Sequence, residues 1–209
     1  MRLTNMIYVI VVIMVLALLW SVWGFFGSNV EQANYSVVKK MHGYEIREYP
    51  AHIVAQTRVQ GPYGESMNNG FRIVAGYIFG KNKTKETIAM TTPVVAKSET
   101  IAMTTPVLST AEGDSQLISF GMPRSYTLET LPIPDDSRVK IITIPAKKYG
   151  AMRFSWYRSD ARIKRMQEKL ISALTNDGFI AEGDIAYAGY NAPFTPPWMT
   201  RNEVLVEIK

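Results

Sequence analysis

The chain has no cysteine and only two histidines among its 209 residues, so several classes of site are excluded at once. Without cysteine there are no disulfides, no thiolate metal sites and no covalent attachment of a prosthetic group through C-x-x-C-H. Two histidines leave little material for a Ser-His-Asp or Cys-His catalytic arrangement. The sequence also lacks the G-x-S-x-G, H-E-x-x-H, P-loop and G-x-G-x-x-G motifs. These absences favour a binding protein over an enzyme.

A basic stripe is absent as well. The formal net charge is +5, and removing Arg2 from the 23 Lys and Arg leaves 22 basic against 18 acidic residues, spread without a long run of one sign. Proteins that bind nucleic acid usually concentrate positive charge on one face, so we expect no nucleic-acid partner. Weak attraction to anionic headgroups or small anions is compatible with this charge.

Charge is missing altogether from residues 7–26, IYVIVVIMVLALLWSVWGFF. As a helix this run is about 30 Å long, which matches the hydrocarbon core of a bilayer, and Trp20, Trp23 and Phe25 lie where an aromatic belt forms. We therefore predict a membrane anchor over residues 1–27 that contacts the lipid bilayer. A cleaved export signal is the alternative, but its apolar core has only about 7 to 15 residues and ends at a small-x-small site, which is missing here.

The flanking charges predict an orientation. Arg2 and the α-amino group precede the apolar run, whereas the next basic residues are Lys39 and Lys40. By the positive-inside rule the protein is single-pass, with a cytoplasmic N-terminus and a globular domain on the outer, periplasmic or extracellular side. Residues 28–40 are polar and show no clear period, so we expect a tether there and a folded domain over 41–209.

The folded part shows the same order of elements twice. In the first half, alternation of apolar and polar residues predicts strands over 44–49 and 53–59. An amphipathic helix closed by Gly80 follows, because apolar residues then recur at helical spacing. These residues are Met67, Phe71, Val74 and Ile78.

The second half predicts strands over 139–144 and 151–156 around a turn at 145–150. A helix then begins with Ser159 as its N-cap and ends at Asn-Asp-Gly, residues 176–178. The repeated order predicts an internally duplicated α+β domain, whose two helices cover a mostly antiparallel sheet.

An identical heptad, IAMTTPV, occurs at 88–94 and again at 101–107. Each copy alternates as a strand, the polar residues 97–99 suit a hairpin turn, and the prolines belong at strand ends or edges. Met90 and Met103 hold equivalent positions and offer a thioether pair to a soft metal, although methionine at such positions also fills cores.

Five segments in collinear order resemble the SOUL family of haem-binding proteins and together cover roughly residues 42–209. They are YEIREY at 44–49, the two heptads, FGMPRSYTLETLP at 120–132, MRFS at 152–155 and AGYNAPFTPPWMTRNEV at 188–204. The resemblance implies a distorted antiparallel β-barrel of two pseudo-repeated halves with two flanking helices. It also implies non-covalent binding of haem b or another tetrapyrrole in a surface groove, without catalysis.

In this family the first helix is associated with the groove. Here that helix offers Met67, Phe71, Val74 and Ala75 as an apolar wall and Arg72 as a cation for a propionate. The alternative is that this stripe simply packs on the sheet.

The candidate axial ligands to haem iron are the two histidines. His42 lies beside Gly43 before the first strand, and His52 shares a mixed strand face with Val54 and Gln56. A tyrosine, a methionine such as Met90 or Met103, or binding without a fixed ligand remain alternatives. The chain would then capture, buffer or deliver a small hydrophobic ligand.

Two further points stay open at this level. Phe194 and Trp198 either cover one end of the barrel or form a lip of the groove. An interaction module that accepts a protein segment, a lipid or another hydrophobic small molecule without haem is the alternative function.

Overall fold

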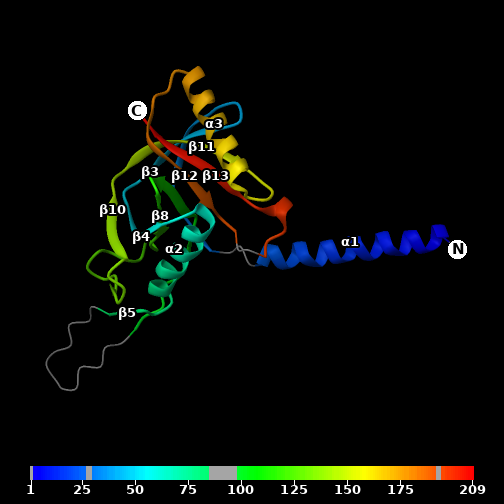
Figure 1. Cartoon of the computed structure of the whole chain (residues 1–209), viewed down its shortest axis with the longest axis horizontal. Coiled ribbons are helices and arrows are strands. Elements are labelled where there is room, and N and C mark those ends of the chain that lie inside the picture. The colour runs from blue at the N-terminus through cyan, green and yellow to red at the C-terminus, as the bar shows by residue number, and fades with distance from the viewer. Residues whose placement is uncertain (1, 27–29, 85–97, 192–193) are drawn as a thin grey trace.

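The computed structural model describes residues 2–26, 30–84, 98–191 and 194–209, so the first heptad and Met90 lie outside the described residues. The head is built on one nine-stranded antiparallel sheet in the order β10-β4-β8-β7-β12-β13-β11-β3-β2. The sheet curls into a half-barrel (Figure 1) with β10 and β2 as its edges, which confirms the expected α+β architecture. The strands are β2 (Ser36–Lys40), β3 (Glu45–Tyr49), β4 (His52–Gln60), β7 (Val107–Glu112), β8 (Ser115–Gly121), β10 (Lys140–Ile144), β11 (Lys147–Phe154), β12 (Ala181–Gly189) and β13 (Asn202–Ile208).

The strand order confirms the internal duplication. Strands β3, β4, β7 and β8 belong to the first half and β10, β11, β12 and β13 to the second, and the two sets occupy mirrored places in the sheet. The first strand of each half pairs with the second strand of the other half, β3 with β11 and β10 with β4. Each half therefore completes the other, and the sheet forms as one unit.

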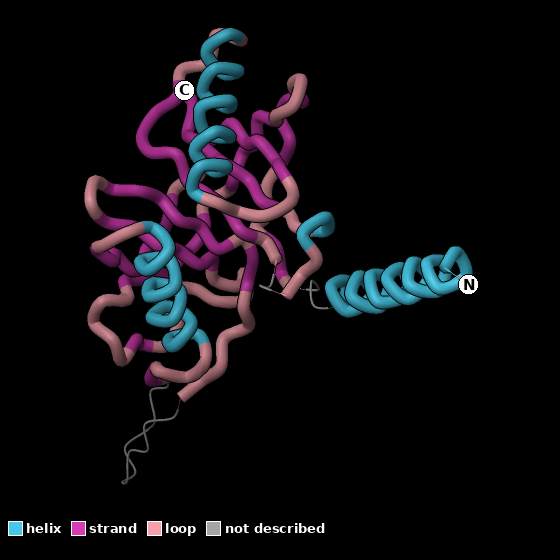
Figure 2. Tube along the Cα trace, turned by 45° about the vertical axis from the view of Figure 1, so that its right-hand side comes forward, coloured by secondary structure: helices cyan, strands magenta, loops and turns pink. Residues whose placement is uncertain are grey.

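Helices α2 (Tyr63–Ile78) and α3 (Asp160–Asn176) cover one face of this sheet (Figure 2). Helix α2 packs on β4 and β8, whereas α3 packs on β11, β12 and β13. The pairing Ile118↔Ser109↔Tyr187↔Val204 runs across the sheet, so the core residues beneath both helices point to the same side. Among the described residues, no helix packs on the opposite face of the sheet.

Local signals explain both helices. Ser159 caps α3 as predicted, since its side chain accepts a hydrogen bond from the Arg162 amide at 3.3 Å. Helix α2 buries Val74, Tyr77 and Ile78 in the core. Its Gly70 lies so close to β8 that an added Cβ would overlap the Ile118 side chain.

Three sequence predictions differ from the structure. The turn expected at 145–150 is shorter, because β11 begins at Lys147 and pairs there with Tyr49 of β3. The second heptad is not one continuous strand: it is divided between β6 (Thr104–Thr105) and β7, with a cis peptide bond before Pro106. Residues 101–103 form no strand, and Ile101 is fully buried.

The segment expected to be a tether contains two strands. β1 (Glu31–Gln32) pairs in parallel with β6, and β2 is the edge strand beside β3. The Ala33 amide donates to the Thr105 carbonyl at 2.7 Å, so this segment is bound to β6 before it continues into the edge strand β2. Short strands also pair at the other end of the head, β5 (Asn82–Lys83) with β9 (Ile133–Pro134), and η1 (Pro197–Met199) is one turn of 3-10 helix.

Helix α1 (Arg2–Phe26) projects away from the head (Figure 1). Its stretch Asn5–Val22 is long and apolar enough to cross a membrane, as an anchor or as a signal sequence, and none of that stretch is buried. None of the buried core clusters of the described residues takes a member from α1.

Candidate functional site

The face of the sheet opposite the helices holds a groove of about 300 Å³. Antiparallel pairing brings alternate residues of neighbouring strands to this face, for example Ala186 of β12 opposite both Thr110 of β7 and Leu205 of β13. The floor and walls are mainly apolar. Their central members are Val54, Leu108, Leu117, Tyr149, Ala186 and Leu205.

The segment before β2 forms one side of the groove. Residues 31–34 line it together with residues 104–106, and the β1-β6 pairing holds these two segments together. A cavity of this size and lining lies at the lower end of the range of small-molecule sites in proteins. The groove can therefore enclose part of a flat apolar ligand and leave an edge in solvent.

His52 is the histidine that lines the groove. Its Nδ1 atom lies 2.9 Å from the Pro50 carbonyl oxygen, which can only accept, so Nδ1 carries the proton in this contact. The lone pair of the neutral ring is then on Nε2, the form in which an imidazole binds a metal. His52 is half-buried, at the first residue of β4.

The rim of the groove carries more carboxylates than cations. Arg124 is bound to Glu31 at 3.1 Å, and Glu207 is bound to Lys147 at 2.6 Å. The remaining carboxylates of the lining are Glu182, which pairs with Lys209, and Asp184. The rim thus favours a ligand that is neutral or positively charged over one that presents several negative charges there.

A second cavity of about 340 Å³, polar in character, lies beside a buried charge network. Glu203 of β13 is fully buried and accepts from Arg47 at 2.6 Å, from Arg201 at 2.9 Å and from the Tyr190 hydroxyl at 2.8 Å. The Arg47 guanidinium also lies 4.3 Å from the centre of the Tyr35 ring. The network joins β3, β13 and the segment before β2.

The ionisation of Glu203 depends on these partners. Burial alone raises the pKa of a carboxyl, but the hydrogen bonds and charge of Arg47, with the charge of Arg201, outweigh it, so the pKa of Glu203 is lowered. Burial also raises the pKa of Tyr190. The carboxylate is therefore charged and already neutralised by the protein, and it is not free to attract a cationic ligand.

The five predicted residues of α2 do not come together with this groove. Val74 and Ala75 are buried in the core and Met67 is half-buried between the two main core clusters. Phe71 keeps 36% of its surface exposed with its ring 5.3 Å from that of Phe120. Arg72 is exposed and donates to Asn69 at 2.5 Å. Of the five predicted residues, Phe71 and Arg72 are the exposed ones, and their part in ligand binding stays a prediction.

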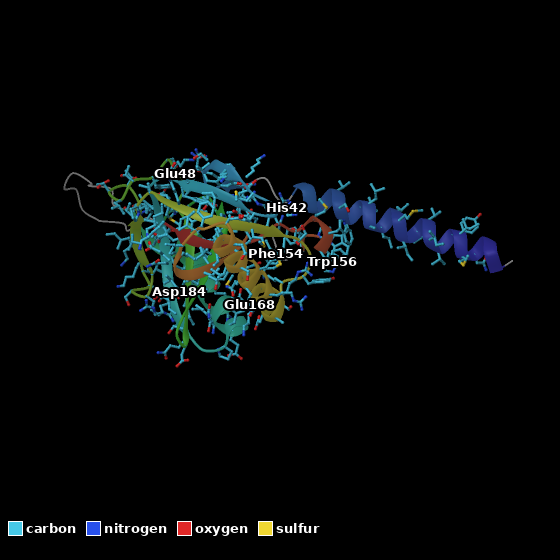
Figure 3. The ribbon with its side chains drawn as sticks, turned by 90° about the horizontal axis from the view of Figure 1, so that it is seen from above. His42, Glu48, Phe154, Trp156, Glu168 and Asp184 are labelled. Carbon is cyan, nitrogen blue, oxygen red and sulfur yellow. The ribbon has the colours of Figure 1, made fainter. Side chains whose placement is uncertain are left out.

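The structure separates the two candidate axial ligands. His42 is exposed in the turn between β2 and β3, beside the second cavity and not in the groove (Figure 3). Met103 packs against the core beneath α2, which is the packing position that its spacing suggested. Among the described residues no group of three or more His, Asp or Glu is placed to hold a metal ion.

Sequence reasoning missed most of the groove. Its lining comes from strands far apart in the chain, so no contiguous motif marks it. The only local signal is the mixed face of β4, where His52 and Val54 alternate with core residues such as Ala55. That face was noted, but its partners on β7, β12 and β13 depend on strand register.

Comparison with known proteins agrees with this architecture. Residues 30–207 match the family model described as SOUL heme-binding protein. "Heme-binding protein 1" of Xenopus laevis and that of Xenopus tropicalis are each 26% identical over 162 residues, which cover 77% of this chain and 81% of either relative.

Solved structures share the fold at lower identity. The C-terminal domain of EcmrR aligns over 84% of this chain and 98% of its own length, with a TM-score of 0.53 and 11% identity. A hydrolase from Listeria innocua aligns over 82% of this chain and 94% of its own length, with a TM-score of 0.53 and 11% identity. These likenesses concern the fold alone. Because the family model spans nearly the whole head, the chain belongs to the SOUL heme-binding protein family.

Proposed function

We propose that this chain binds haem or a related tetrapyrrole non-covalently in the groove on the helix-free face of its sheet. The observation that carries the proposal is the apolar groove itself, with the imidazole of His52 in its lining. Family membership and the heme-binding names of the two Xenopus relatives support the choice of ligand. We propose no catalytic role.

The residues present suit such a ligand. Leu108, Leu117 and Leu205 offer apolar surface to a planar ring, and burial of that surface is the main favourable term. His52 would offer Nε2 as a donor to the haem iron, while the Pro50 carbonyl orients its ring. When bound, haem would supply an iron centre with open coordination positions. Arg124 offers a cation at the rim for a propionate, in competition with Glu31.

The carboxylates of the rim support a second candidate, in which the groove accepts a neutral or cationic hydrophobic molecule without iron. Asp184 lines the groove and would repel the propionates of haem, whereas the charge of Glu182 is balanced by Lys209. An iron-free porphyrin and its neutral ester are suitable probes. Stronger binding of the neutral ester would favour this candidate.

An absorption titration tests the proposal. The full chain in detergent is titrated with haem and with an iron-free porphyrin, and Ala186→Trp is compared because it fills the floor of the groove. We expect this variant to lose binding of both ligands and His52→Ala to change only the haem spectrum. Unchanged haem binding by Ala186→Trp would exclude the groove as the site.

Two variants outside the groove are the matched controls. His42→Ala removes the other histidine, and we expect the spectrum of bound haem to remain unchanged. Phe71→Ala removes the exposed ring of α2 and, with the groove as the site, leaves affinity unchanged. Loss of binding in Phe71→Ala alone would move the site to α2, as the family resemblance suggested.

We also propose that residues 7–26 anchor the protein in a bilayer with the head on the outer side. The apolar stretch Asn5–Val22 and the single Arg2 before it support this orientation. Because the chain has no cysteine, a single Ser36→Cys substitution gives a unique labelling site. Labelling of intact cells by a membrane-impermeant maleimide is expected. Labelling only after lysis contradicts the orientation, and a shortened product indicates a cleaved signal.

A further inference from the structure

Four large aromatic side chains form one exposed surface on the head, which we name the aromatic patch: Trp156, Tyr157, Phe194 and Trp198. Their exposed fractions are 48%, 67%, 52% and 45%. The Trp156 ring lies 6.5 Å from that of Trp198 and 6.2 Å from that of Tyr157, so these three rings are continuous. Phe194 is linked to them through Trp20, which donates to the Phe194 carbonyl and packs on Trp198. A cluster of this kind marks an interaction surface and not a random scatter of apolar residues.

The backbone holds Trp156 in a costly conformation. Its φ angle is 83°, in the left-handed region that non-glycine residues rarely adopt. Its amide donates to the Pro197 carbonyl and to the Thr200 hydroxyl, both at 3.0 Å, and its carbonyl accepts from Asn202 at 3.2 Å. Such strain persists only where surrounding contacts maintain it, and here those contacts bind the loop to η1. The exposed position of Trp156 is therefore built into the fold.

The aromatic patch continues directly into α1. The Trp20 indole N–H donates to the Phe194 carbonyl at 2.9 Å. The Trp20 ring packs edge-on against that of Trp198 with 5.5 Å between centroids. Trp20 lies within the apolar stretch Asn5–Val22, so a bilayer that holds this stretch reaches the depth of Phe194 and Trp198. Figure 3 likewise places Trp156 at the α1 end of the head and Asp184 away from it.

We infer that the aromatic patch inserts into the headgroup region of the same bilayer that α1 spans, so that the head lies against the membrane in one orientation. This inference rests on the proposed anchoring. Tryptophan and tyrosine favour this region because their rings are apolar and their N–H or O–H groups bind water and headgroups. Residues 31–33 are bound to β6 of the head, which leaves few residues between α1 and the head and agrees with a head held close to the bilayer.

Depth-dependent fluorescence quenching tests this inference on the full chain in phosphatidylcholine vesicles. The chain has four tryptophans, so Trp20→Phe with Trp23→Phe leaves Trp156 and Trp198 as the emitters. We expect quenching by lipids brominated near the headgroup end of the acyl chains and weaker quenching by lipids brominated near the chain terminus. We also expect the emission of Trp156 and Trp198 to be blue-shifted relative to that of tryptophan in water. Iodide in the aqueous phase should quench it only weakly.

A matched control reports on a part of the head away from the aromatic patch. Phe79, which caps α2, is 60% exposed. Phe79→Trp in a chain whose four native tryptophans are replaced by Phe is expected to stay open to iodide and insensitive to brominated lipid. Far-UV circular dichroism of each variant checks that the fold is retained.

The complementary variant, Trp156→Phe with Trp198→Phe, leaves Trp20 and Trp23 as emitters and reports on the anchor alone. If these are quenched by brominated lipid while Trp156 and Trp198 are not, the inference is overturned and the anchoring stands. Failure of both sets excludes the anchoring and the inference together. Emission of Trp156 and Trp198 that is shielded from iodide yet insensitive to bromine would show that protein covers the aromatic patch, which also overturns the inference.

Discussion

The Glu203 carboxylate is a charged group buried on the groove side of the sheet, and its partners decide whether that burial is tolerable. Arg47 and Arg201 neutralise it, and the Tyr190 hydroxyl occupies a further lone pair. Desolvation of a charge is compensated only by such close and complete pairing. Each member of the network is therefore expected to contribute far more to the free energy of unfolding than a member of a surface ion pair does.

Removal of the Glu203 charge is expected to destabilise the folded protein strongly. Glu203→Gln leaves Arg47 buried with a weakened partner, so the free energy of unfolding should fall by about 3 to 5 kcal/mol. Glu207→Gln is the matched control on the same strand. The ion pair of Glu207 with Lys147 is partly exposed, so it contributes less than about 1 kcal/mol to the free energy of unfolding. Urea unfolding followed by circular dichroism measures both. Equal losses in the two variants would contradict the central role of the network.

The same residue predicts a pH dependence. The pKa of Glu203 is lower in the folded protein than its ordinary value of 4.5, so the unfolded state binds the proton first as the pH falls. The stability that Glu203 contributes is therefore complete above about pH 4.5 and is lost as the pH falls through the folded pKa. Urea midpoints between pH 7 and pH 3 should fall more steeply in the native chain than in Glu203→Gln. Parallel curves would assign the acid sensitivity to other carboxyls.

At the scale of elements, the contact between α2 and β8 depends on a glycine. An added Cβ at Gly70 would overlap the Ile118 side chain, which is fully buried, so the helix or this side chain would have to shift. Gly70→Ala should therefore lower the free energy of unfolding by about 1 to 3 kcal/mol. Differential scanning calorimetry measures the change.

Gly64 on the same helix provides the control. An added Cβ at Gly64 would meet no atom within 4 Å. Gly64→Ala should leave the stability unchanged or raise it by up to about 1 kcal/mol, because alanine favours helix. A Gly70→Ala variant of unchanged stability would show that α2 can move away from β8 without loss of packing energy.

At the scale of the whole molecule, we expect the head to fold without α1. No member of the buried core clusters of the described residues comes from α1, and the family match begins at residue 30. Removal of residues 1–27 should therefore leave the thermal unfolding midpoint of the head and its affinity for haem unchanged while membrane association is lost. Calorimetry, haem titration and vesicle flotation measure these outcomes. A head that unfolds without α1 would show that Trp20 supports Trp198 structurally.

Periodicity alone was sufficient for much of the architecture. Strands 44–49 and 53–59, the helix closed before Gly80 and the Ser159 cap depend on neighbours within a few residues, and the structure contains them. The repeat of strand, strand and helix likewise predicted two pseudo-repeated halves. These features are local, so side-chain pattern and capping chemistry indicate them without knowledge of the tertiary contacts.

The prediction failed where distant segments meet. Residues 31–40 carry no clear period and looked like a tether, yet β1 pairs with β6 and β2 pairs with β3. Their backbone groups, more than their side chains, determine that pairing, and backbone groups leave no trace in composition. The shortened turn after β10 has the same cause, because Lys147 extends β11 through its pairing with Tyr49.

The amino-acid sequence by itself determined that this protein has one apolar N-terminal helix, a duplicated α+β head, no thiol and only two histidines. Only the tertiary structure decided that His52 and not His42 lines the groove, that Val74 and Ala75 belong to the core, and that Trp20 meets Trp198. The physical reason is that helical and strand periods act over a few residues. Groove, charge network and aromatic patch each need strand register and chain crossings that bring together residues up to 174 positions apart.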